Sequence, residues 1–132
     1  MLVPLNGQLV EHDQARVSVF DRGFIFGDAL YEGLRAFDDP RRGHPRVIGL
    51  SRHVARLQRG LREVGIEWDA TKIGPATDEL LAAAGLREAF VYWQITRGTP
   101  DLSRGPVRLR APSASSAPTP PTVFAYASPL PP

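Results

Sequence analysis

The stretch that decides the fold is SVFDRGFIFGDALYEGLRAF, residues 18–37. Residues 17–20 are mostly apolar and half β-branched, which predicts a short strand, and Asp21-Arg22-Gly23 then interrupts it with residues that favour turns. After a second turn at Gly27-Asp28, residues 29–37 alternate in character and predict a longer strand. One face of that strand would carry Leu30, Glu32, Leu34 and Ala36, and the other would carry Tyr31, Gly33, Arg35 and Phe37.

The face with Tyr31 and Arg35 is a candidate binding surface. These two residues lie about 13 Å apart along the strand. Gly33 stands between them, and its missing side chain leaves room for something to lie against the backbone. The same pattern also fits a half-exposed sheet face with a glycine bulge.

The chain on either side of this stretch alternates between strands and helices. Asn6-Gly7 between two apolar runs predicts a β-hairpin near the N-terminus. Residues 38–45 predict a loop, and residues 46–50 predict a short strand that returns from it. Residues 87–97 predict a long strand, and three of its aromatic residues would form either core or a pocket wall: Phe90, Tyr92 and Trp93.

Two helices separate these strands. The first has Ser51 as its N-cap, apolar residues at helical spacing, and Gly65 just past its end. A second stripe along this helix consists of His53, Arg56 and Gly60. The second helix is expected at residues 71–84, with a proline near its first turn and a glycine as its stop.

The C-terminal quarter differs in composition from the rest. Nine of the 13 prolines lie from Pro100 onward, so residues 100–121 predict a loop and residues 122–128 predict one more strand at a sheet edge. Residues 1–99 would form a small two-layer α+β domain with a mostly antiparallel sheet and two main helices, and the last strand would belong to the same domain.

Composition limits the classes of function. The 132 residues carry a net charge of only +2, and acids are interspersed among the 15 arginines, so no nucleic-acid partner is expected. The chain has no cysteine, which excludes disulfides and thiolate chemistry. No run approaches the roughly 18 apolar residues of a membrane span, and the N-terminus is unlike a signal peptide. We therefore expect a cytoplasmic protein without a membrane contact.

Three ordered blocks of sequence resemble one enzyme family. They are VSVFDRGFIFGDALYEGLR at residues 17–35, RHVARL at 52–57 and VYWQITRG at 91–98. These blocks resemble the class IV (fold type IV) pyridoxal-phosphate aminotransferases, the family of D-amino-acid and branched-chain aminotransferases. They span most of residues 5–100, and the resemblance implies the N-terminal small domain of that fold.

The resemblance also implies roles for individual residues. Arg56 of the H-x-x-R-L motif would bind the phosphate of pyridoxal 5'-phosphate, since a guanidinium binds phosphate bidentately and stays charged. Tyr31 and Glu32 fall on motif positions at the active-site mouth. The substrate-binding positions implied by the family are Tyr31, Phe26, Arg35, Tyr92 and Arg97. The implied substrates are an amino acid and a 2-oxo acid.

The chain departs from the family pattern at three points. The D-amino-acid enzymes have an arginine and a histidine shortly after the TRGT segment, but no histidine follows residues 96–99 here. The branched-chain enzymes have an arginine where this chain has Gln94. The lysine that holds the cofactor is not matched either, because the only lysine, Lys72, lies outside every block and is expected on the surface.

In the family, the cofactor lysine belongs to a second, larger domain, which is absent from these 132 residues. We therefore expect the N-terminal portion of an aminotransferase, inactive alone, that forms a homodimer or joins a complementary large-domain chain. The alternatives are a non-catalytic remnant or dimerisation module, and a fragment of the related aminodeoxychorismate lyase.

Overall fold

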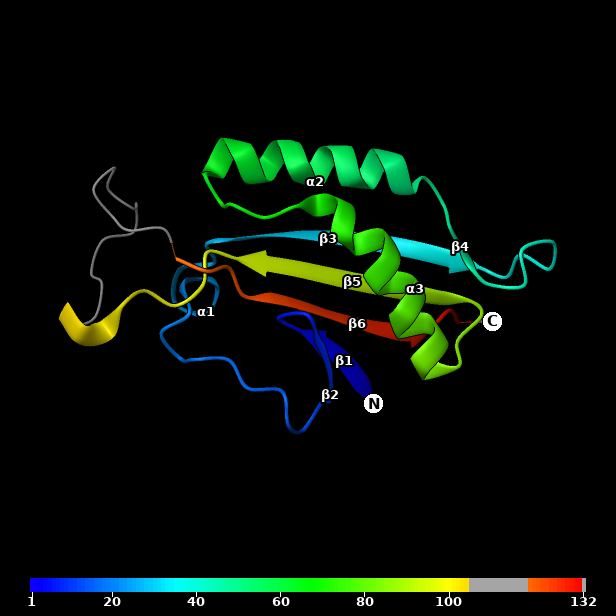
Figure 1. Cartoon of the computed structure of the whole chain (residues 1–132), viewed down its shortest axis with the longest axis horizontal. Coiled ribbons are helices and arrows are strands. Elements are labelled where there is room, and N and C mark those ends of the chain that lie inside the picture. The colour runs from blue at the N-terminus through cyan, green and yellow to red at the C-terminus, as the bar shows by residue number, and fades with distance from the viewer. Residues whose placement is uncertain (105–118, 132) are drawn as a thin grey trace.

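A six-stranded sheet forms one layer of the structure, and two helices form the other (Figure 1). This computed structural model describes residues 1–104 and 119–131. Within that part of the chain the strand order is β2-β1-β6-β5-β3-β4, and each neighbouring pair is antiparallel. The predicted two-layer α+β class is confirmed.

Six strands form the sheet. They are β1 (Leu2–Leu5), β2 (Gln8–Glu11), β3 (Ala29–Phe37), β4 (Arg46–Val47), β5 (Ala89–Thr96) and β6 (Val123–Pro129). The α-helices are α1 (Arg22–Phe26), α2 (Leu50–Val64) and α3 (Ile73–Ala84). Two short 3₁₀ helices are η1 (Ala70–Lys72) and η2 (Leu102–Arg104).

The N-terminal hairpin joins the sheet through its turn. Asn6 and Gly7 have positive φ angles of 51° and 82°, as a tight two-residue hairpin turn requires, so the predicted hairpin is confirmed. The Asn6 backbone N–H donates to the Val123 carbonyl at 2.8 Å, and its Oδ1 accepts from the Val123 N–H at 2.9 Å. β6 therefore lies between β1 and β5, and the prediction of an edge strand at residues 122–128 was wrong.

β3 follows the predicted alternation over its whole length. Leu34 and Ala36 are fully buried on one face, whereas Tyr31 and Phe37 are exposed on the other. β5 pairs with β3 from Ala29 to Ala36, but β4 pairs only with Ala36 and Phe37. Within the described residues, the first half of β3 is thus an edge of the sheet.

The main core lies between the sheet and the helices, with α2 along β3 and α3 across β5 and β6 (Figure 1). Its largest fully buried members come from both layers: Leu34, Val91, Trp93 and Ile95 from the sheet, and Leu61, Ile73 and Leu80 from the helices. The Trp93 indole N–H donates to Thr77 Oγ1 at 2.9 Å, so this ring is buried with its donor satisfied. Trp93 is therefore core, while Phe90 and Tyr92 lie on the opposite face.

Both main helices end at glycines, as predicted. Gly65 and Gly85 adopt left-handed φ angles of 67° and 65°, and their N–H groups bond to the last turn of α2 and α3. The predicted N-cap at Ser51 was wrong, because α2 begins at Leu50 and its cap is Gly49 with φ of 65°. The left-handed turn at Gly49 also ends the preceding strand early, at Val47 rather than residue 50.

Residues 17–20 form no strand, so that prediction was wrong. Val17, Val19 and Phe20 are exposed and have no neighbouring strand to pair with, and strand propensity has little effect without a partner. The turn expected at Asp21 is instead a helix start. Its Oδ1 accepts the Gly23 N–H at 2.8 Å and caps α1.

The proline-rich segment falls largely outside the described residues. Of the loop predicted at 100–121, residues 105–118 lie outside that part of the chain, and residues 102–104 form η2. Among the described helices, none combines the length and the hydropathy that crossing a membrane would require.

Candidate functional site

Three tyrosines stack across the face of the sheet opposite the helices. Tyr31 of β3 stacks on Tyr92 of β5 with ring centroids 5.8 Å apart, and Tyr92 stacks on Tyr126 of β6 at 5.3 Å. The Phe124 ring continues the row, 6.1 Å from that of Tyr126. Tyr92 lies opposite Tyr126 in register, and Tyr31 is its diagonal neighbour. We call this row, Tyr31, Tyr92, Phe124 and Tyr126, the tyrosine face.

Gly33 does not leave an empty space beside the tyrosine face. A Cβ atom built on Gly33 would lie 3.0 Å from the Phe90 ring, so that ring occupies the room expected for a ligand. Arg35 lies opposite Phe90 in register and is exposed. The structure therefore brings Tyr31, Arg35 and Tyr92 to one open face of the sheet.

On the helix side of the sheet, β3 and α2 build a charged cluster around Glu32. Glu32 is only 2% exposed. Its Oε1 accepts from Arg56 Nε at 2.8 Å and its Oε2 accepts from Arg56 Nη2 at 2.7 Å, which makes a bidentate pair. His53 lies one turn earlier on α2, with Nδ1 2.7 Å from Oε2. Burial alone would raise the pKa of Glu32, but hydrogen bonds and charges from Arg56 and His53 hold it below its ordinary value.

The Arg56 guanidinium is held by a buried partner but is itself accessible. Its side chain is 63% exposed, and its Nη1 has no hydrogen bond to any residue in the described part of the chain. The hydrogen bond and charge of Glu32 raise the pKa of Arg56, and Tyr31 adds to that rise. Glu32 and Tyr31 point to opposite faces of β3, and the first half of this strand is an open edge.

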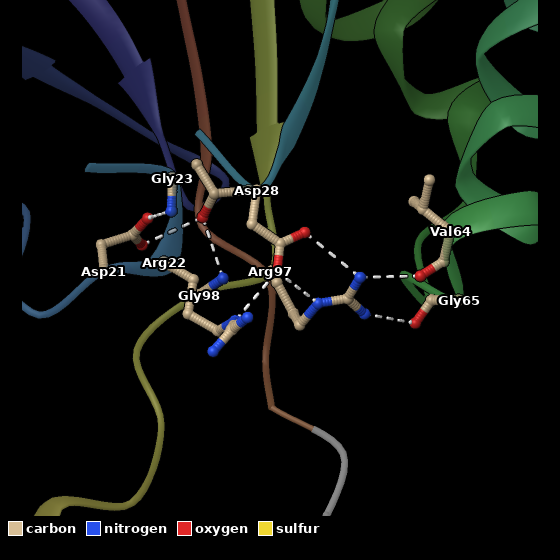
Figure 2. Close-up of polar contacts among 9 residues, drawn as sticks. Asp21, Arg22, Gly23, Asp28, Val64, Gly65, Arg97 and Gly98 are labelled. Carbon is tan, nitrogen blue, oxygen red and sulfur yellow. Dashed lines mark hydrogen bonds and ion pairs between the residues drawn. The ribbon is translucent and has the colours of Figure 1, made fainter. Parts of the chain in front are cut away.

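A second charged cluster, centred on Asp28, joins four segments of the chain (Figure 2). Arg97 at the end of β5 donates to Asp28 through Nε at 2.8 Å and Nη2 at 3.2 Å. The same guanidinium donates to the carbonyls of Val64 and Gly65, where α2 ends, at 2.7 and 3.0 Å. Arg22 of α1 donates from Nε to Asp28 Oδ2 at 2.9 Å.

Arg97 is therefore directed away from the tyrosine face. Its side chain is 14% exposed, and each of its three guanidinium nitrogens donates to Asp28 or to the end of α2. A cation at a helix C-terminus also interacts favourably with the helix dipole. This geometry makes Arg97 a bridge between β5, β3 and α2 and leaves no free pair of donors for a substrate carboxylate.

Asp21, which the sequence indicated only as a turn residue, is a buried hub. It is 1% exposed, and its Oδ2 accepts from the hydroxyls of Thr96 at 3.0 Å and Thr122 at 2.6 Å. Gly23 is needed for this junction, because a Cβ there would lie 2.4 Å from Thr96 Cγ2. The spacing of Asp21 and Gly23 could have indicated an N-cap, but the threonine partners lie 75 and 101 residues away and leave no local signal.

Phe26 contacts a residue of its own helix, and Lys72 lies on the helix side of the sheet. The Arg22 guanidinium carbon is 4.9 Å from the centre of the Phe26 ring, a cation–π contact within the α1 segment. Lys72 lines a cavity on the helix side together with Trp93. Trp93 and Tyr92 are consecutive on β5 and point to opposite faces, so Lys72 lies across the sheet from the tyrosine face.

The chain is similar to curated proteins over nearly its whole length. It is 34% identical over 134 residues to a Methanocaldococcus jannaschii protein named for branched-chain-amino-acid aminotransferase activity. This alignment covers 100% of this chain and 41% of the relative. It is 30% identical over 128 residues to D-alanine aminotransferase of Staphylococcus haemolyticus, which covers 93% of this chain and 39% of that enzyme. The chain thus spans about two fifths of the length of these relatives. No family model matches it.

The fold is similar to that of two solved enzymes. Branched-chain amino acid aminotransferase of Escherichia coli matches 98% of this chain and 40% of its own, with a TM-score of 0.80 and 20% identity, which shows the fold alone. The 4-amino-4-deoxychorismate lyase of Pseudomonas aeruginosa matches the same shares with a TM-score of 0.69 and 32% identity.

The curated relatives belong to the same family that the sequence blocks resemble, and the fold agrees with it. The blocks contain α1, most of β3 and most of β5. They include Tyr31 and Tyr92 of the tyrosine face and Arg22, Asp28 and Arg97 of the Asp28 cluster. The two names among the curated relatives, branched-chain and D-alanine aminotransferase, are the two branches that the motifs resemble. The chain belongs to the class IV (fold type IV) pyridoxal-phosphate-dependent aminotransferases and corresponds to their N-terminal small domain.

Proposed function

We propose that this chain forms the phosphate- and substrate-contacting part of an enzyme that transfers an amino group between an amino acid and a 2-oxo acid with pyridoxal 5'-phosphate. The observation that carries the proposal is the exposed Arg56 guanidinium, held by buried Glu32 at the open edge of β3. When bound, the cofactor supplies an electron sink for the transfer.

The residues at this edge fit a phosphate group. Glu32 takes the Nε and Nη2 edge of Arg56, which leaves the Nη1 side of the fork to donate to an anion. Buried Glu32 binds Arg56 through two hydrogen bonds, which fixes the plane of the guanidinium before a ligand binds. Less side-chain entropy of Arg56 is therefore lost when an anion binds. His53 contacts the same carboxylate through Nδ1 and so helps to fix the orientation of Glu32.

The amine that holds the cofactor would come from outside these 132 residues. Lys72 is the only lysine, and it lies in η1 beside the β1–β2 hairpin. Arg56 lies over β3, and β6 and β5 separate that strand from the hairpin. A lysine-bearing large domain, in the same polypeptide or in a separate chain, would bring its amine to the open side of β3. Residues 1–99 with the strand at 122–128 would then act as the small domain.

The tyrosine face would receive the substrate. Tyr31 and Tyr92 offer aromatic surface to a side chain, and Arg35 on the same face offers a guanidinium to a carboxylate. Phe26 would contribute apolar surface from α1. Arg97 takes a positioning role in this proposal, because its donors hold Asp28 and the end of α2.

We also propose that the chain acts in the cytoplasm and associates as a homodimer or with a complementary large-domain chain. The support for association is a group of exposed apolar side chains on and before α1: Val17, Val19, Phe20, Phe24 and Ile25. Exposed apolar groups of this kind favour association. Sedimentation of the wild type against Phe24→Ser should show a loss of association in the variant, and cell fractionation should place the protein in the cytoplasm.

Titration with pyridoxal 5'-phosphate, followed by phosphorus NMR, tests the phosphate assignment. Arg56→Ala should abolish saturable binding, while Arg56→Lys keeps the charge but loses the fork and should bind more weakly than the wild type. Arg59→Ala removes an exposed arginine from the same helix and should change nothing. Equal affinity of the wild type and Arg56→Ala, with unchanged circular dichroism, would remove Arg56 from the phosphate site.

The 32% identity to the P. aeruginosa lyase favours carbon–carbon bond cleavage as a second candidate. Assays of the chain reconstituted with a lysine-bearing large domain separate the two reactions. Amino transfer from an amino acid to a 2-oxo acid supports the first proposal, and cleavage of 4-amino-4-deoxychorismate without transfer would replace it.

A further inference from the structure

A cavity on the helix side of the sheet plays no part in the proposed transfer. Its volume is about 380 Å³, within the range of roughly 300 to 1,000 Å³ found for small-molecule pockets. The β1–β2 hairpin, α3 and the middle of the sheet surround it. Its apolar walls include Pro4, Leu9, Trp68, Ala76, Trp93 and Val123.

Both tryptophans of the chain line this cavity. Their ring centroids are 6.5 Å apart, with the planes tilted by 33°. The Trp93 N–H is taken by Thr77, but the Trp68 N–H donates to no residue in the described part of the chain. The cavity therefore has aromatic walls, mostly from the partly exposed Trp68 because Trp93 is only 2% exposed, and the Trp68 N–H is an available donor.

Charged residues border the cavity along one side of α3 and η1. Lys72, Ala76 and Glu79 have the spacing of one helix face, with Lys72 and Glu79 about 10 Å apart along the axis. Neither charge forms an ion pair within residues 1–104 and 119–131. Lys72 and Trp68 come from the same short segment, so the donors are concentrated there, and Glu79 lies two turns further on.

We propose that this cavity binds a planar aromatic carboxylate, with its ring against Trp68 and Trp93 and its acid group on the Lys72 ammonium and the Trp68 N–H. Charge complementarity favours an acid over a neutral ring, because Lys72 forms no ion pair within the described residues and the oxygen of its neighbour Asp69 already accepts from the Thr71 N–H and hydroxyl. The site is independent of the tyrosine face, because Trp93 and Tyr92 point to opposite sides of β5.

NMR of the nitrogen-15-labelled chain tests this proposal, because the two indole N–H resonances both report on the cavity. Titration with 2-naphthoate should shift both resonances along one saturable curve, with the larger shift at Trp68. The neutral analogue 2-naphthalenemethanol should bind about fivefold more weakly, which is the scale of one partly exposed ion pair. Absence of saturable shifts with 2-naphthoate, or equal affinity for the two probes, would overturn the proposal.

Three variants make the test specific. Ala76→Leu keeps a good helix former and fills the cavity, so it should abolish the shifts. Lys72→Met should weaken the binding of 2-naphthoate about fivefold and leave the affinity for 2-naphthalenemethanol unchanged. Arg59→Met removes an exposed cation from α2, away from the cavity, and should match the wild type. Undiminished 2-naphthoate binding in Ala76→Leu or Lys72→Met would place the ligand elsewhere and refute the assignment.

Discussion

Arg97 and Asp28 form a bidentate ion pair where β5 ends and β3 begins, with Nε 2.8 Å from Oδ2. The same guanidinium binds the last carbonyls of α2. This one side chain thereby holds the helix that carries Arg56 against the strand that carries Tyr31. The geometry of the proposed site thus depends on a contact that lies outside it.

Loss of this bridge should destabilise the fold. Arg97→Met leaves the Asp28 carboxylate largely buried with Arg22 as its remaining partner, so we expect a loss of about 2–3 kcal/mol, somewhat less than for a fully orphaned buried charge. Arg87→Met is the matched control, because the Arg87–Asp38 pair lies on the surface and should contribute at most about 1 kcal/mol. Urea denaturation measures both. Equal losses of unfolding free energy in the two variants would show that the Arg97 bridge contributes no more than a surface ion pair.

Acid should weaken the fold partly through Asp28. Burial alone would raise its pKa, but hydrogen bonds from Arg97 and Arg22 and their charges hold it below the ordinary value of 3.8. A carboxyl group with a lowered folded-state pKa contributes its full stability above pH 3.8 and loses it as the pH falls toward the folded value. Asp28→Asn should therefore be less stable than the wild type at pH 6, and the difference should shrink below about pH 3.8. A constant difference from pH 6 to pH 3 would contradict this assignment.

Gly98 should tolerate no side chain. Its φ is +82°, and an added Cβ would lie 1.9 Å from the Pro120 carbonyl oxygen. Gly85 has a similar left-handed φ of 65°, with nothing within 4 Å of the added atom. Gly85→Ala should cost about 1 kcal/mol for backbone strain alone, and Gly98→Ala should cost at least twice that. Thermal unfolding of both variants measures the difference, and similar melting temperatures would show that the Pro120 segment moves away freely.

The parts of the fold that the sequence predicted correctly depend on local signals. Alternation over residues 29–37, the Asn6-Gly7 turn and the glycines after α2 and α3 act within a few residues, so they can be recognised without knowledge of the rest. Two of the failed predictions depend on distant partners. Residues 122–128 become a central strand because Asn6 binds Val123, and residues 17–20 have no strand beside them.

The same distinction applies to the candidate site. Strand alternation predicted that Tyr31 and Arg35 share a face, and the structure adds Tyr92 by the register of β3 and β5. The sequence pattern could not predict the pairing of Glu32 with Arg56 or of Arg97 with Asp28, because these residues lie 24 and 69 positions apart. A charged residue in a motif therefore does not reveal from sequence whether its charge faces a ligand or a neighbour.

Alkaline titration should reveal the raised pKa of Tyr92. Burial raises the pKa of Tyr92 above its ordinary value of 10.0, and the charges of Tyr126 and Tyr31 raise it further. The folded protein then holds the Tyr92 proton more tightly than the unfolded chain, so stability should fall as the pH rises above 10. Near-ultraviolet tyrosinate absorbance should show one late-titrating tyrosine in the wild type and none in Tyr92→Phe. Tyr31→Phe is the control, because removal of one neighbouring charge should shift the late titration to lower pH without abolishing it. A late component that persists in Tyr92→Phe would show that the most strongly perturbed ring is another member of the tyrosine face.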